Sequence, residues 1–119
     1  MKTNNVIVTK SKGFAIRVVM LTRHLQMGKH EYVMSRQLLR SGTSVGANVK
    51  EAIRGQSRAD FAAKMNIALK EISETEYWLE ILHETGYLTK AEFDSMYEDC
   101  AEIIRILMSI VKSSKEPQL

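Results

Sequence analysis

Basic side chains recur at helical spacing between Arg36 and Arg54. Positions three or four residues apart form one stripe, the basic stripe, which consists of Arg36, Arg40, Thr43, Ala47, Lys50 and Arg54. Four of these six residues are positively charged. Such a row can bind successive phosphates by electrostatic attraction, without reading base sequence. Arg58 and Lys64 continue the positive charge along the chain. The stretch therefore indicates a surface for RNA or DNA backbones.

The net charge of +3 conceals an uneven distribution along the 119-residue chain. Residues 1–70 contain 13 Lys and Arg against three acids, whereas residues 71–119 contain four Lys and Arg against 11 acids. A charged helix face is commonly only a solvated face. The asymmetry instead favours a polyanion partner, or contact between the basic half of one subunit and the acidic half of the next.

Patterns for metal binding and catalysis are weak. Glu80 and His83 form a Glu-x-x-His pair, but di-iron helical bundles need two such pairs and two more glutamates. The one cysteine, Cys100, lies among apolar residues, which is typical of a buried thiol and not of a nucleophile. We therefore expect a protein that is not an enzyme and that uses no metal or cofactor.

Length and composition favour a single all-α domain over residues 1–119. The chain has 45% hydrophobic residues and only one proline, which suits long helices. A single cysteine allows no internal disulfide, as in reducing compartments. No apolar run is long enough to span a bilayer, and the first residues lack the apolar core of a signal peptide. We expect a cytoplasmic protein with no membrane partner.

Apolar periodicity and capping signals predict four helices, at about residues 9–27, 33–54, 58–85 and 90–112. Gly28 and Gly86 are expected to end the first and third. Ser57–Asp60 and Thr89–Glu92 resemble capping boxes at the starts of the third and fourth. Residues 1–8, which include the β-branched run Val6–Val8, are expected to be a loose lead-in, and residues 113–119 a flexible tail. Short loops predict an up-down-up-down antiparallel four-helix bundle.

Two features of these helices suggest close packing. Gly42 and Gly46 lie inside the second helix, where they cost roughly 1–2 kcal/mol and imply close approach by core side chains, a subunit or a ligand. The third and fourth helices carry second apolar rows beyond what one core requires. We predict that these rows supply oligomer contacts through Ile67, Trp78, Ile81, Met96, Ile103 and Ile110.

The run from Ser35 to Ala52 resembles the signature of bacterial four-helix-bundle proteins encoded by intervening sequences of 23S ribosomal RNA genes. Ser57–Phe61, Lys64–Glu71 and Glu74–Leu79 resemble the same family. The resemblance implies an up-down bundle that assembles as a homopentameric ring. The chain is also similar to the accessory variability determinant of diversity-generating retroelements, which implies nucleic acid and a reverse transcriptase as partners.

The leading hypothesis is a non-enzymatic homo-oligomer that binds RNA or DNA backbones through Arg36, Arg40, Lys50, Arg54, Arg58 and Lys64. The alternative is a structural scaffold, in which the basic and acidic halves contact each other between subunits or contact a partner protein.

Overall fold

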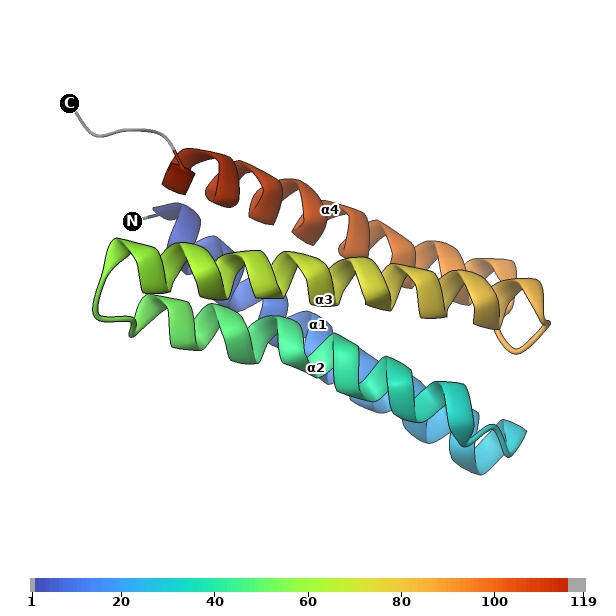
Figure 1. Cartoon of the computed structure of the whole chain (residues 1–119). Helices are drawn as coiled ribbons and strands as arrows, with labels where there is room; N and C mark the ends of the chain where they lie inside the picture. The colour runs from blue at the N-terminus through green and yellow to red at the C-terminus, as the bar shows by residue number, and fades with distance from the viewer. Residues whose placement is uncertain (1, 116–119) are drawn as a thin grey trace.

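The computed structural model describes residues 2–115 and the side chains of residues 6–115. It consists of four helices, α1 (Lys2–Lys29), α2 (Val33–Ile53), α3 (Arg58–Glu84) and α4 (Lys90–Lys115). Figure 1 shows them side by side in an elongated bundle of 53 × 21 × 19 Å. The described part of the chain is therefore all-α.

Each helix packs against two others. α2 contacts α1 and α3, and α4 contacts α3 and α1. The start of α1, the α2–α3 turn and the end of α4 lie at one end of the bundle, and the other two turns lie at the opposite end (Figure 1). Positions distant in sequence, such as the start of α1 and the end of α2, are thereby brought together.

The first helix begins at Lys2, so the predicted lead-in over residues 1–8 is wrong from residue 2 onward. Ile7 is fully buried and continues the inward row of Ser11, Phe14 and Val18. Burial of this row outweighs the β-preference of the run Val6–Val8, because tertiary packing commonly overrides weak local propensities.

The turn between α1 and α2 is built by His30 and Glu31. Gly28 remains helical, and His30 takes the left-handed conformation with φ 55°, so the prediction that Gly28 ends the helix is wrong. The buried carboxylate of Glu31 accepts hydrogen bonds from the backbone N–H groups of Val33, Met34 and Ser35, at 3.2, 3.1 and 2.7 Å. It thereby satisfies donors that the first turn of α2 leaves unpaired.

The glycines of α2 face α1. A Cβ at Gly42 would lie 2.8 Å from both methyl carbons of Val18, and one at Gly46 would lie 3.3 Å from the carbonyl oxygen of Ser11. Close approach of another helix is therefore confirmed, and that helix belongs to the same chain. No subunit or ligand contact is needed to explain these two glycines.

The starts of α3 and α4 confirm the predicted N-cap at Ser57 and the predicted capping box at Thr89 and Glu92. Ser57 Oγ accepts from the Asp60 N–H at 3.0 Å. Thr89 and Glu92 exchange backbone-to-side-chain hydrogen bonds of 2.8 and 3.2 Å. Gly86, with φ 87°, follows the end of α3 as predicted. These signals fix the helix starts because they depend only on adjacent residues.

α4 buries in the core the apolar row that was predicted to form subunit contacts. Met96, Ile103 and Ile110 are 4, 1 and 7% exposed, so they pack inside the chain and leave almost no surface for a second subunit. Their assignment to an oligomer interface is therefore wrong. They alternate with Cys100 and Leu107 at spacings of four and three, which is the seam that neighbouring bundle helices share. α4 also continues through residues 113–115, where a tail was predicted; residues 116–119 lie outside the described part.

Candidate nucleic-acid interface

The basic stripe extends along most of α2 and does not form one cluster. Arg36 and Arg54 are 18 residues apart, or about 27 Å along the helix axis at 1.5 Å per residue. Arg36 lies in the first turn of α2, towards the α1–α2 turn, whereas Lys50 and Arg54 lie at the end of α2, beside the α2–α3 turn. The two ends of the stripe therefore face different surroundings.

Arg40 is bound to carboxylates of α3. Its guanidinium donates to Glu71 at 3.0 Å and also bonds Glu74. Glu74 accepts a further hydrogen bond from the indole N–H of Trp78 at 3.0 Å. The Trp78 bond and then the Arg40 bond lower the pKa of Glu74. Arg40 thus joins α2 to α3, and the prediction that it presents an open positive charge is corrected.

Of the other predicted cations, Arg36 lies at the α1–α2 end, whereas Lys50, Arg54, Arg58 and Lys64 lie at the α2–α3 end, together with Lys12 of α1. We call Lys12, Lys50, Arg54, Arg58 and Lys64 the basic end. Lys64 forms a 3.1 Å ion pair with Glu51, in which both side chains are largely solvent-accessible. Among the described residues, Lys12, Lys50, Arg54 and Arg58 form no ion pair within 4.0 Å. The basic end therefore carries a positive potential that its own acids do not fully neutralise.

Two depressions at this end share Ala47, Lys50 and Arg54. The first, the α1–α2 groove, has a volume of about 510 Å³. It is lined by Val8, Ser11, Lys12, Ala15, Thr43, Gly46, Ala47, Lys50, Ile53 and Arg54. The second, the α2–α3 depression, has about 590 Å³ and adds Glu51, Asp60 and Lys64. Lys12 was not among the predicted site residues, because its position beside Lys50 and Arg54 depends on how α1 packs on α2.

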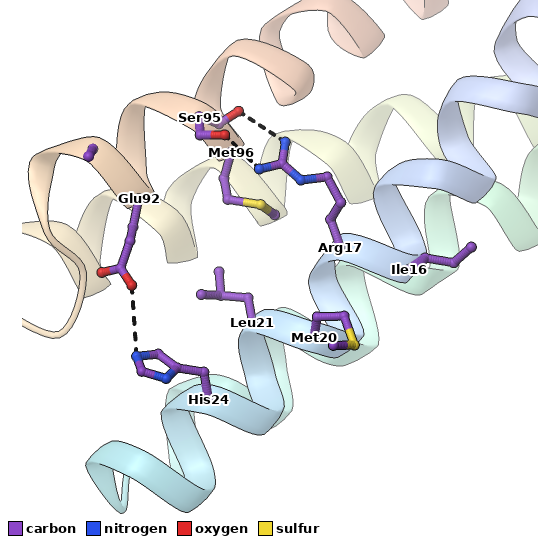
Figure 2. Close-up of a pocket in the computed structure, with 9 residues that line it drawn as sticks. Ile16, Arg17, Met20, Leu21, His24, Glu92, Ser95 and Met96 are labelled. Carbon is purple, nitrogen blue, oxygen red and sulfur yellow. Dashed lines mark hydrogen bonds and ion pairs between the residues drawn. The ribbon is translucent and has the colours of Figure 1, made fainter.

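At the opposite end, polar contacts join α1 to α4 across a third depression, shown in Figure 2. Arg17 donates to the Ser95 hydroxyl at 2.6 Å and forms an ion pair with Asp99. His24 lies 3.7 Å from Glu92. The cations of this seam already face acids, so it is a poorer phosphate site than the basic end.

The residues considered for catalysis are placed as follows. Cys100 is fully buried, as predicted, and desolvation raises its pKa to about 12, which keeps the thiol protonated. His83 stacks on Phe93 with ring centroids 4.5 Å apart. Within residues 2–115, no three or more His, Cys, Asp or Glu side chains are grouped so that they could hold a metal ion. None of the described helices is both long and apolar enough to cross a membrane.

Exposed large apolar side chains are more numerous on α1 than on any other helix, and the sequence interpretation did not single them out. Ile16, Met20 and Met27 are 56, 58 and 80% exposed and follow one another at helical spacing. Of the predicted interface residues, Ile67 is 40% exposed, whereas Trp78 and Ile81 are partly buried. The sequence pattern alone could not distinguish exposed from buried apolar residues, because it does not show which apolar row of a helix faces the core.

Comparison with known proteins connects this fold to a family. The family model described as 23S rRNA-intervening sequence protein matches residues 3–109. The chain is also similar to a crystal structure from Bacteroides thetaiotaomicron, described as a protein with unknown function from the S23 ribosomal protein family. The two are 53% identical, the match covers 92% of this chain and 98% of that one, and the TM-score is 0.91. Comparison with curated proteins gives no match. The chain belongs to the 23S rRNA-intervening sequence protein family.

Proposed function

We propose that this protein is a non-enzymatic nucleic-acid-binding protein and that the basic end holds the RNA or DNA backbone. The observation that carries the proposal is the convergence of Lys12, Lys50, Arg54, Arg58 and Lys64 from three helices at one end of the bundle. Among the residues that line the two depressions, only Glu51 and Asp60 carry a negative charge. Backbone phosphates are the polyanion best suited to such a surface.

Binding at this surface would be insensitive to base sequence. Lysine and arginine side chains that contact phosphates position a protein on nucleic acid without distinguishing bases. The described side chains that line the two depressions include no aromatic residue on which a base could stack. We therefore expect affinity to depend on salt and on the number of cations, and to vary little between sequences.

The test compares two double variants with equal net charge. Lys50→Ala/Arg54→Ala removes two cations from the basic end, and Lys29→Ala/Lys90→Ala removes two exposed cations from the opposite end. Fluorescence anisotropy with labelled RNA and DNA should show weaker binding for the first variant and nearly unchanged binding for the second. Equal weakening in both would assign binding to net charge and would remove the basic end from the proposal.

We also propose that the chain acts as a homo-oligomer. The supporting observation is the apolar row of Ile16, Met20 and Met27, which a solitary bundle would leave in water. The sequence resemblance implies a pentameric ring of up-down antiparallel bundles, in which the basic ends would add their fields. Such a ring could also serve as a scaffold for a protein partner, for which the resemblance suggests a reverse transcriptase.

A further inference from the structure

The α1–α2 groove combines apolar walls with cations. The side chains of Val8, Ala15, Ala47 and Ile53 line it beside Lys12, Lys50 and Arg54. Val8 and Ile53 are 38 and 42% exposed, so their apolar surface is in contact with water. The groove volume of about 510 Å³ lies within the range of clefts that hold small organic groups. The groove therefore suits a ligand that has both an anionic and an apolar part.

α1 and α2 approach each other closely at the floor of this groove. Gly46 has no side chain, and its backbone lies directly against the carbonyl of Ser11. The groove residues of each helix recur three or four positions apart, Val8, Ser11, Lys12 and Ala15 on α1 and Thr43 to Arg54 on α2. Lys12 on α1 therefore lies on one side of the groove, and Lys50 and Arg54 lie on the other.

The charges favour this groove over the neighbouring α2–α3 depression. All charged residues that line the groove are positive, namely Lys12, Lys50 and Arg54. The α2–α3 depression contains Glu51 and Asp60 as well, and Lys64 is already paired with Glu51. A phosphate in that depression would meet two negative charges. An anion should therefore settle first in the groove.

We propose that the α1–α2 groove holds an unpaired nucleic-acid strand, with phosphates at the three cations and a base or sugar against Ala47 and Ile53. This inference rests on the proposed function. A duplex keeps its base faces stacked and presents chiefly phosphates and groove edges, so it could use the cations but not the apolar walls. Only an unpaired strand offers both surfaces at once.

The test fills the groove without changing any charge. Ala47 is exposed on α2, and leucine has nearly the same helix propensity as alanine, so Ala47→Leu should fold normally. Ala63→Leu adds the same volume on an exposed face of α3 and is the matched control. The ligands are a short labelled single strand and the corresponding duplex, each as RNA and as DNA, with polyglutamate as a competitor that has charge but no bases. Circular dichroism checks the fold.

We expect Ala47→Leu to weaken single-strand binding about tenfold, because the leucine side chain would occupy the space that the base or sugar fills. Duplex binding should change little, and Ala63→Leu should behave as wild type. Polyglutamate should compete poorly with the single strand. A larger loss for RNA than for DNA would show that the ribose also contacts the groove, and an equal loss would assign the contact to base and phosphate.

Three results would overturn the inference. If Ala47→Leu binds the single strand normally while Lys50→Ala/Arg54→Ala does not, the groove is not used, although the proposed function stands. Equal affinity of the wild type for single strand and duplex, or full competition by polyglutamate, would show that only charge matters. If no nucleic acid binds at low salt, the proposed function fails together with the groove.

Discussion

At the scale of single residues, the buried Glu31 carboxylate has the clearest structural role. It accepts three backbone N–H groups at the start of α2 and is 7% exposed. Sequence reasoning placed Glu31 in a loop, since the residue precedes the apolar pattern of α2 and is not one of the small side chains that usually cap helices. Its role depends on a left-handed turn at His30, which the sequence alone did not indicate.

We predict that Glu31→Ala lowers the free energy of unfolding by about 2 kcal/mol, because it leaves three donors without their acceptor. Urea unfolding followed by circular dichroism measures the change. Glu98→Ala, at an exposed site on α4, is the control and should change stability by less than about 0.5 kcal/mol. A Glu31 variant as stable as this control would show that water replaces the carboxylate.

Trp78 gives a direct readout of the Arg40–Glu74 contact, because it is the only tryptophan in the chain. Its indole N–H and Arg40 lower the pKa of Glu74, so this contact contributes stability above the ordinary glutamate pKa and loses it as the pH falls through the lowered value. We predict that tryptophan fluorescence changes on acidification with a midpoint below pH 4.5. Arg40→Ala should raise that midpoint only in part, since the Trp78 bond remains. The same transition in Glu74→Gln would contradict the assignment.

At the scale of helices, the sequence predicted most of the architecture. The N-cap at Ser57 and the capping box at Thr89 located two helix starts, because capping is a local interaction. Errors arose where distant contacts decide the outcome. Burial of Ile7 stabilises a helix over the first residues. On α4, Met96, Ile103 and Ile110 pack in the core. The ion pairs of Arg40 with Glu71 and Glu74 were not predicted, because these acids are more than 30 residues away in sequence.

The glycines of α1 and α2 give a prediction about helix packing. Gly42→Ala should destabilise the fold by about 1–3 kcal/mol, because its Cβ would lie 2.8 Å from Val18. Gly13→Ala meets no atom within 4 Å and should stabilise the fold by about 0.5–1 kcal/mol. Thermal unfolding of the two variants makes the comparison. Val18→Ala should partly rescue Gly42→Ala; without that rescue, the contact between these two residues would not be the cause.

At the scale of the whole molecule, the basic end and the exposed apolar row of Ile16, Met20 and Met27 occupy different parts of the surface. The basic end lies at the α2–α3 turn, whereas the exposed apolar row from Ile16 to Met27 follows α1 towards the other end. The overall charge asymmetry was readable from the sequence. The concentration of positive charge at one end of the bundle could not be read from the sequence, since it depends on α1 and α3 being placed beside the last turns of α2.

The apolar row predicts self-association. Light scattering after size exclusion should give a multiple of the 13.6 kDa chain mass, and a pentamer is expected from the family resemblance. Ile16→Glu/Met20→Glu should reduce the mass to that of a single chain with helicity retained, because the charges would be buried on association. Tyr77→Glu, which replaces an exposed residue on α3, is the control. A wild-type mass of 13.6 kDa at micromolar concentration would contradict the proposal.

The central claim is that phosphates bind at the basic end, and the salt dependence of affinity tests it most directly. The measurement is the slope of log affinity against log salt between about 50 and 200 mM, for the wild type and for Lys50→Ala/Arg54→Ala. We predict a steep wild-type slope that becomes shallower by roughly 0.7–0.9 for each phosphate contact removed. Identical slopes for the two proteins, or binding that does not respond to salt, would contradict the account.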